Sequence, residues 1–400
     1  MKDGYDWIIV GGGVVGLSTA MALLKKFPKS SLAVFEKEND LGLHASGLNS
    51  GVLHAGFYYN PTTLKAKLCV AGSQIMKEYC EKNNLPLARL GKVVVPTDSD
   101  YKKPMETILY NARENGVKLE LIGSSRLRQL EPYVSPTIKE AIHSPDSAVV
   151  SPKKVLHKMS HDIKNAGGSI FLNSRVSRIF PDKSKIEANG NEYRYGHLVN
   201  AAGCHADKVY RMVNEDRRYR ILPFKGLYYE LSKSSQIKVN GNIYPVPNLN
   251  VPFLGVHFTK SVSGEVHIGP TAIPALGREN YRGLTGIEID DFKNISTLIL
   301  QQYWLNNDGF RKLVHEESPK ILKHFFYKSA KKLIPALSCT DLKPSKKVGI
   351  RAQLYDMNNK KLIMDYIVEK KDNSIHILNA VSPAFTSCFT FSKYLLDNYL

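Results

Sequence analysis

A run of glycines lies between a predicted strand and a predicted helix near the amino terminus of the chain. The pattern is a strand over 5–10, G-x-G-x-x-G over 11–16, a helix over 14–27 that ends before Pro28, and a strand over 32–36. Parallel strands joined by a crossover helix open a doubly wound sheet. The three glycines permit a tight turn, the approach of a pyrophosphate, and close helix–strand packing. Glu36 is placed to accept hydrogen bonds from a ribose, so the segment predicts a dinucleotide site.

The uncharged stretch from Trp7 to Leu24 has the length of a membrane span or a signal-peptide core. The glycines at its centre would break such a helix, and acids at 3 and 6 precede it in place of a basic segment. Five scattered cysteines without C-x-x-C spacing indicate neither a disulfide framework nor a zinc site. We therefore expect a metal-free, cytoplasmic protein, with peripheral contact at the inner face of the membrane left open.

The chain is strongly basic. Its 55 Lys and Arg residues exceed its 37 Asp and Glu residues by 18, which suits an anionic substrate, an anionic membrane surface or a nucleic acid. The basic residues are spread in short pairs such as Lys25-Lys26, with no RGG or aromatic-interleaved tract. This distribution favours a solvated, lysine-rich surface over nucleic-acid binding.

The segment after Glu36 distinguishes flavin from nicotinamide. Residues 44–59 (HASGLNSGVLHAGFYY) alternate small and polar side chains instead of simply repeating βαβ units. Such a segment can run close under a flat ring system and offer backbone amides where large side chains would clash. This pattern favours FAD as the cofactor.

The rest of the chain divides into two kinds of segment. Helices are predicted over 61–82, 101–115, 152–166, 289–304 and 320–333 and from Pro383, and strands over 92–95, 169–180, 197–201, 349–354, 362–368 and 375–378. Residues 220–269 are β-rich, with alternating aromatic side chains. The predicted fold class is α/β. A discontinuous, Rossmann-like FAD-binding domain takes in 1–85, 145–218 and 340–400, and a β-rich α+β substrate or cap domain takes in 86–144 and 219–339.

Several motifs carry a family resemblance. They are 44–59, 64–70 (LKAKLCV), 223–226 (PFKG), 255–259 (GVHFT), 264–270 (GEVHIGP), 349–353 (GIRAQ) and 376–384 (HILNAVSPA). On these motifs the chain resembles the L-2-hydroxyglutarate dehydrogenase/oxidase family of D-amino-acid-oxidase-like FAD enzymes. It departs from that family at Leu48, where Arg is expected, and at Lys225-Gly226-Leu227, where Arg-Gly-Glu is expected.

The resemblance implies a D-amino-acid-oxidase-like fold, noncovalent FAD, and oxidation of L-2-hydroxyglutarate, or a closely related 2-hydroxy acid, to 2-oxoglutarate. Hydride would pass to flavin N5, and electrons then to a quinone, another acceptor or oxygen. An FAD-dependent amine or amino-acid oxidase and a basic flavin-bearing RNA-binding protein are the alternative functions.

The residues expected to contact FAD come from six segments. The resemblance places Val176 at the adenine, and the free amides at the start of the last helix can stabilise negative charge on the reduced flavin. The full set is Gly11, Gly13, Val14, Val15, Gly16, Glu36, Lys37, His44, Ser46, Asn49, Ser50, Gly51, Val52, Val176, Ala201, Ala202, Gly203, Ser382, Pro383 and Ala384.

A small anionic 2-hydroxy-diacid needs a carboxylate partner and a base. Arg351 matches the position whose guanidinium holds the substrate carboxylate in related enzymes, and its planar fork can donate two parallel hydrogen bonds. His54 and His257 are equal candidates for the base that takes the hydroxyl proton. The further substrate-binding candidates are Lys225, Tyr228 and Tyr58.

Two basic segments remain. Residues 320–334 are basic, aromatic and roughly amphipathic, which is typical of interfacial helices, although packing on their own domain is the commoner use of such a pattern. Lys65 and Lys67 fall at a helix start near the flavin segment and are expected to be solvated.

Overall fold

The computed structural model describes residues 4–247 and 253–400 of the chain. Its amino-terminal unit consists of β1 (Gly4–Val10), α1 (Val14–Lys26) and β2 (Leu32–Phe35). β1 runs parallel both to β2 and to β12 (Asn191–Asn200). The β-α-β unit predicted from the glycine pattern is therefore confirmed.

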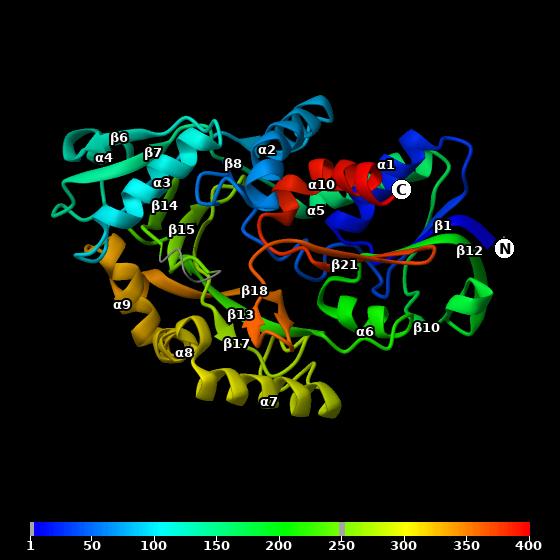
Figure 1. The fold of residues 1–400 in the computed structure, drawn as a ribbon. Coiled ribbons are helices and arrows are strands. Elements are labelled where there is room, and N and C mark those ends of the chain that lie inside the picture. Colours follow the sequence, from blue (N-terminus) through cyan, green and yellow to red (C-terminus); the bar gives the residue numbers. More distant parts are fainter. Residues whose placement is uncertain (1–3, 248–252) are drawn as a thin grey trace.

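The first sheet has the order β10-β11-β12-β1-β2-β9, with β21 beside β12 and β20 beside β21. Figure 1 shows the helices α1, α2, α5 and α10 gathered over this sheet. Buried side chains such as Leu17, Met159 and Phe391 belong to the core on this side. The elements not yet bounded are α2 (Leu64–Lys82), α5 (Pro152–Asn165), α10 (Ala384–Tyr399), β9 (Ser169–Phe171), β10 (Val176–Phe180), β11 (Lys185–Ala188), β20 (Ile367–Lys371) and β21 (Ser374–Asn379).

The second sheet has the order β19-β18-β13-β16-β15-β14-β5-β7-β6, with β17 beside β13. Its long strands β13 and β18 pair antiparallel, from Tyr219 opposite Asp356 to Leu231 opposite Leu342. The strands are β5 (Lys92–Val95), β6 (Glu120–Gly123), β7 (Glu140–Ser144), β13 (Tyr219–Leu231), β14 (Asn242–Pro245), β15 (His257–Lys260), β16 (Val266–Gly269), β17 (Ile273–Pro274), β18 (Leu342–Asp356) and β19 (Lys361–Leu362).

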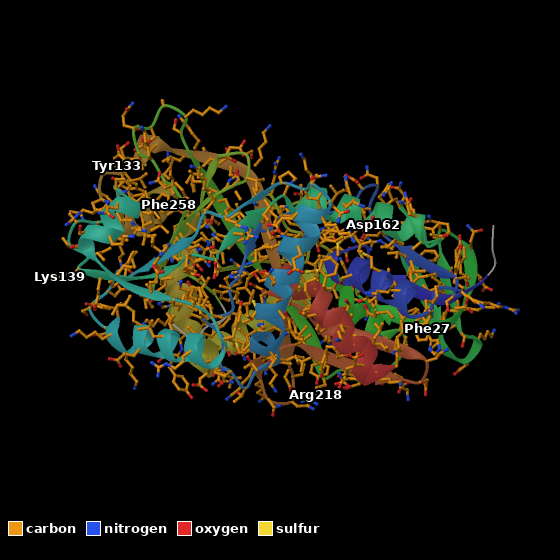
Figure 2. The ribbon with its side chains drawn as sticks, turned by 90° about the horizontal axis from the view of Figure 1, so that it is seen from above. Phe27, Tyr133, Lys139, Asp162, Arg218 and Phe258 are labelled. Carbon is orange, nitrogen blue, oxygen red and sulfur yellow. The ribbon has the colours of Figure 1, made fainter. Side chains whose placement is uncertain are left out.

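Smaller elements complete the fold. The view from above places Phe27 toward one end of the molecule and Lys139 at the other (Figure 2). A third sheet, β3-β8-β4, contains short strands, and α6 packs against β21 and β13. These elements are β3 (Val52–Leu53), β4 (Leu87–Ala88), β8 (Ala148–Val150), α3 (Lys102–Glu114), α4 (Ser124–Leu130), α6 (Ala206–Arg211), α7 (Ile289–Leu305), α8 (Phe310–Glu317) and α9 (Lys323–Leu333).

Three local predictions are wrong. The single strand predicted over 362–368 is divided between β19 and β20, because Asp365 turns toward α2 and accepts hydrogen bonds from the Leu64 and Lys65 amides, at 2.7 and 3.1 Å. A carboxylate is stabilised at a helix amino terminus, and α2 accordingly begins at Leu64 rather than at 61. Lys65, expected in solvent, is buried.

The predicted domain boundaries stay a prediction. The strand β18 pairs within the second sheet although it lies in the segment 340–400, and the chain then returns to the first sheet through β20 and β21. On this sheet membership we propose that the cap domain also takes in β18.

A buried ionic cluster ties the loop after β17 to α6 and α7. The Arg278 guanidinium contacts both carboxylate oxygens of Asp207, at 2.6 and 2.8 Å, and its Nε donates to Asp291 at 3.0 Å. Burial opposes ionisation of Asp207, but the adjacent guanidinium outweighs it and holds the pKa of that carboxyl below its usual value. The cluster therefore holds this loop against the FAD-side helix α6.

Replacing Arg278 with Met should remove both short hydrogen bonds to the buried Asp207 carboxylate, which keeps only Arg211 at 3.7 Å, and one of the two cations paired with Asp291. We expect the free energy of unfolding to fall by about 3–5 kcal/mol, measured by urea denaturation. Arg282→Met, the same change at an exposed position of the same loop, is the control. Equal stability of the two variants would contradict a structural role for the cluster.

Candidate functional site

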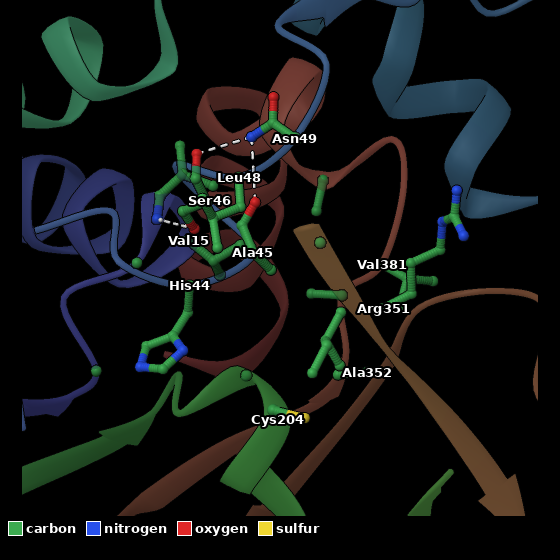
Figure 3. Close-up of a pocket in the computed structure, with 18 of the residues that line it drawn as sticks. Val15, His44, Ala45, Ser46, Leu48, Asn49, Cys204, Arg351, Ala352 and Val381 are labelled. Carbon is green, nitrogen blue, oxygen red and sulfur yellow. Dashed lines mark hydrogen bonds between the residues drawn. The ribbon is translucent and has the colours of Figure 1, made fainter. Parts of the chain in front are cut away.

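A cavity of about 420 Å³ opens where the first sheet meets the second. The glycine turn, the segment 42–54, the residues after β12 and the start of α10 form one part of its lining. Residues from β13, β14, β15 and β18 form the other part. Figure 3 shows Arg351 and Ala352 of β18 on this side. A volume of this size is typical of cofactor and substrate sites.

The glycine turn is held by close backbone contacts. Gly11 has a φ of +111°, and a Cβ there would lie 2.4 Å from the Ala201 carbonyl oxygen. A Cβ at Gly16 would lie 2.0 Å from the Gly11 carbonyl oxygen. Gly13 is the N-cap of α1 and offers no side-chain cap, so apart from the Val14 amide, which donates to Ser46 Oγ at 3.0 Å, the first turn can offer its amides to an anion. This cradle fits the pyrophosphate of a dinucleotide.

Glu36 closes the turn from the end of β2. Its Oε2 accepts a hydrogen bond from the Gly12 amide at 2.8 Å, and its Oε1 accepts one from the Glu38 amide at 3.0 Å. Glu36 also lines the cavity. The carboxylate is therefore fixed beside the phosphate cradle, where the remaining lone pairs can accept from ribose hydroxyls.

The segment 44–51 is folded against the start of α1. Ser46 Oγ accepts a hydrogen bond from the Val14 amide at 3.0 Å, and Asn49 Nδ2 donates to the Ala45 and Ser46 carbonyls at 3.2 and 2.7 Å (Figure 3). Asn49 Oδ1 accepts from the Gly51 amide at 2.8 Å. The backbone is thereby held in a fixed path along the cavity wall.

A polar strap crosses from the loop after β17 to this wall. Tyr281 Oη lies 2.7 Å from His44 Nδ1, and Glu279 lies 2.7 Å from both Lys37 Nζ and His205 Nε2. The Glu38, His44 and Glu279 atoms lie close enough to hold a cation, but the Lys37 ammonium already contacts both carboxylates. The Lys37 ammonium therefore already supplies the positive charge between these two carboxylates, and no metal site is inferred from them.

At the opposite end of the cavity, Arg351 extends from β18. Its Nη1 donates to the Thr271 carbonyl at 3.0 Å, and the guanidinium lies 5.3 Å from the centre of the Phe253 ring. Burial lowers the pKa of Arg351. Within the described part of the chain, the guanidinium has no carboxylate within 4.0 Å. It is therefore a cation open to an anionic ligand.

Two imidazoles lie at the same end. His257 Nδ1 is 2.7 Å from the Gly255 carbonyl, and its ring stacks on Tyr244 at 3.8 Å between centroids. His54 Nε2 is 3.4 Å from Ser382 Oγ. Burial, followed by nearby positive charge, lowers the pKa of each imidazole to about 3. Both rings are therefore neutral at physiological pH.

The structure brings most of the predicted site residues together. Every FAD candidate except Gly16 and Gly51 lines the cavity, and so do His54, His257, Arg351 and Tyr228. Gly16 and Gly51 instead permit close packing, since a Cβ at Gly51 would lie 2.4 Å from the Val150 carbonyl. For all of these site residues, contact with the cofactor or the substrate stays a prediction.

Two substrate candidates lie outside the lining. Lys225 Nζ donates to Asn280 Oδ1 at 2.6 Å, and Tyr58 is packed behind the wall with its hydroxyl unpaired among the described residues. Tyr244 and Tyr281, which do line the cavity, were not expected. The aromatic alternation around Tyr244 indicated a strand, but nothing local indicated that this ring would stack on His257.

Comparison with known proteins agrees with this geometry. A family model for FAD dependent oxidoreductases matches residues 6–397. L-2-hydroxyglutarate dehydrogenase of Escherichia coli strain K12 is 34% identical over 404 residues, covering 98% of this chain and 92% of that protein. The mitochondrial enzyme of that name from Homo sapiens is 33% identical over 415 residues, covering 98% and 88%.

Solved structures show the same fold. An L-α-glycerophosphate oxidase of Mycoplasma pneumoniae with FAD bound superposes with a TM-score of 0.78 at 19% identity, covering 99% of this chain and 95% of that one. A glycine oxidase of Geobacillus kaustophilus gives 0.73 at 15%, covering 99% and 94%. With the family model, these findings make FAD the cofactor of this chain.

Replacing Glu36 with Ala should weaken FAD binding. Loss of the fixed carboxylate removes charge-assisted hydrogen bonds, so we expect the dissociation constant to rise about 10- to 100-fold. Titration of the apoprotein with FAD, followed by quenching of flavin fluorescence, measures this change. Glu106→Ala, an exposed acid on α3, is the control. Affinity within twofold of wild type for Glu36→Ala would contradict the assignment.

Proposed function

Because the chain belongs to the FAD-dependent oxidoreductase family, and within it to the L-2-hydroxyglutarate dehydrogenases, we propose that it oxidises L-2-hydroxyglutarate to 2-oxoglutarate. The observation that carries this proposal is the cation Arg351, which among the described residues has no carboxylate partner and lies in a cavity that also presents two neutral imidazoles. A 2-hydroxy acid supplies both groups that this arrangement accepts, a carboxylate and a hydroxyl proton.

FAD, when bound, supplies the acceptor for the hydride that leaves the substrate carbon. Arg351 binds a carboxylate of the substrate and orients the carbon next to it. Its hydrogen bond to the Thr271 carbonyl fixes one guanidinium nitrogen and leaves the others for the ligand. The apolar wall formed by Phe253 and Leu254 limits water at this end.

Of the two imidazoles, His257 is the better oriented base. Its Nδ1 lies within hydrogen-bonding distance of the Gly255 carbonyl. Since a carbonyl can only accept, Nδ1 carries the proton, and Nε2 keeps a free lone pair. Stacking on Tyr244 further fixes the plane of the ring. We therefore assign the hydroxyl proton to His257 Nε2.

The two alternative functions are less well supported. Solved amino-acid oxidases share the fold at low identity, as the glycine oxidase does at 15%, whereas the relatives above 30% are L-2-hydroxyglutarate dehydrogenases. The basic residues also form several acid-paired contacts, such as Lys208 with Asp291 at 2.8 Å. The positive charge therefore does not require a nucleic acid.

Replacing Arg351 with Met should remove the carboxylate partner at nearly constant volume. We expect kcat/KM for L-2-hydroxyglutarate to fall at least 100-fold, because a bidentate charge-assisted contact contributes about 3 kcal/mol. Arg351→Lys keeps the charge but loses the fork, and it should retain part of the activity. Stopped-flow reduction of the flavin measures both variants. Wild-type kcat/KM in Arg351→Met would refute the assignment.

The electron acceptor is proposed to be a quinone or oxygen, and a bilayer quinone would require membrane contact. Among residues 4–247 and 253–400, none of the helices has both the length and the hydrophobicity needed to cross a bilayer. The predicted amphipathic face of α9 is directed inward, where Phe326 and Leu333 pack with Phe258. Any contact must therefore use other residues.

Such residues lie on α7 and just before α9. Ile289, Leu300 and Trp304 are 74%, 58% and 76% exposed, and Ile321 and Leu322 are each 59% exposed. Figure 1 shows α7, α8 and α9 following one another along one edge of the molecule. Exposed apolar side chains beside lysines suit an anionic bilayer surface, and we propose this edge as the membrane contact.

Replacing Trp304 with Glu should weaken binding to vesicles that contain an anionic lipid. Cosedimentation at low salt is expected to fall at least fivefold, because an apolar anchor becomes a repelled charge. Tyr110→Glu, at an aromatic residue of α3 that is 58% exposed, is the control. Unchanged cosedimentation of Trp304→Glu, or an equal loss in the control, would rule out this edge.

A further inference from the structure

A lysine is buried behind the substrate end of the cavity. Lys92 begins β5, between Ser144 of β7 and Asn242 of β14, and only 1% of its surface is exposed. Its Nζ has no hydrogen-bond partner in the part of the chain that the structure describes. A buried, unpaired ammonium costs stability, and proteins retain such groups where they serve function.

Aromatic rings take the place of a counter-ion. Lys92 Nζ lies 4.3 Å from the centre of the Tyr244 ring, and 5.4 Å from those of Phe57 and Tyr58. Ring faces attract a cation but cannot accept its proton. Burial raises the pKa of the neighbouring Cys69 thiol to about 12, so this group carries no compensating charge at neutral pH.

The same rings connect Lys92 to the candidate base. Tyr244 contacts the ammonium and also stacks on His257, with 3.8 Å between centroids and 17° between planes. Lys92 itself is not part of the cavity lining, whereas Tyr244, His257 and His54 are. The Tyr244 ring thus contacts both the ammonium and the His257 imidazole, while the ammonium itself does not line the cavity.

We propose that Lys92 is a positioning residue whose buried charge adds to burial in opposing protonation of His257 and His54, and so extends toward acid pH the range in which the base can accept the substrate hydroxyl proton. The proposal rests on the proposed oxidation of a 2-hydroxy acid, because that reaction needs the base. The proposed role of Lys92 is electrostatic, so an uncharged side chain at this position would remove it.

The order of protonation supports this role. Burial lowers the pKa of Lys92 to about 7, and burial together with Lys92 lowers the pKa of His54 and of His257 to about 3. As the pH falls, the first proton therefore goes to Lys92, and its charge then disfavours a second proton on either ring. The other titratable groups facing this cluster are Tyr58, Lys65, Cys69, Tyr228, Tyr244 and Arg351.

The test replaces Lys92 with Met, which has a similar length and no charge. The apparent pKa of the acid limb of kcat/KM, measured between about pH 2.5 and 9, should rise by about one unit from its wild-type position near 3, since removal of a nearby cation raises the pKa of an imidazole. The melting temperature should rise by about 2 °C or more, because an uncompensated buried charge is gone. Lys92→Arg keeps the charge and should keep the wild-type limb.

Lys77→Met is the matched control. Lys77 is also buried, but it lies on α2 away from the cavity lining, beside the acids Glu78, Glu81 and Asp146. Lys77→Met should leave the apparent pKa of the acid limb of kcat/KM unchanged. An unmoved limb in Lys92→Met, an equal movement in Lys77→Met, or failure of Lys92→Met to fold would each overturn the proposal.

The substrate assignment is separable from this test. If wild-type protein does not oxidise L-2-hydroxyglutarate, the proposed function fails, and the role of Lys92 is then measured on the FAD-loaded protein by ¹³C NMR titration of the imidazoles. In Lys92→Met the pKa of His54 or His257 should rise by about one unit. No rise in either would refute the electrostatic role independently of any substrate.

Discussion

The close contact between the glycine turn and the end of β12 determines where everything else in this molecule lies. Gly11 approaches the Ala201 carbonyl, and Gly16 approaches the Gly11 carbonyl, so closely that neither position has room for a Cβ. The contact fixes the amino terminus of α1 at the carboxyl ends of β1 and β12. Glu36 and Ser46 are then bonded to this turn, and the cavity wall follows from them.

The two ends of the cavity differ in how their charged side chains are paired. The FAD end is polar, and its acids have partners, since Glu38 and Glu279 both contact Lys37, and Glu279 also contacts His205. At the substrate end, by contrast, Arg351 lacks a carboxylate partner among the described residues. An anionic substrate would supply the missing negative charge. The electrostatic attraction of Arg351 therefore gives the site a preference for acids.

Sequence patterns were sufficient where the relevant contacts are local. The glycine turn, Glu36 and the segment 44–54 could be predicted because each lies within a short stretch whose spacing fixes its geometry. The long pairing of β13 with β18 joins segments more than a hundred residues apart, so neither its register nor the side on which Lys225 points could be predicted. Lys225 accordingly binds Asn280 rather than lining the cavity.

Charged residues were the least predictable part. Lys92 precedes three valines, a pattern that indicates the solvent end of a strand, yet it is enclosed because strands on both sides and three rings cover it. Lys65 is buried for a similar reason, since Asp365 arrives from a remote loop to cap its helix. Such burial is a property of tertiary packing and leaves no periodic signal in the sequence.

The most direct measurement is the visible spectrum of the purified, FAD-loaded protein before and after anaerobic addition of L-2-hydroxyglutarate. An oxidised-flavin spectrum that bleaches within one turnover, with one 2-oxoglutarate formed per flavin, is the result that a site built for a 2-hydroxy acid requires. A flavin that stays oxidised with this substrate but bleaches with an amino acid would contradict the account.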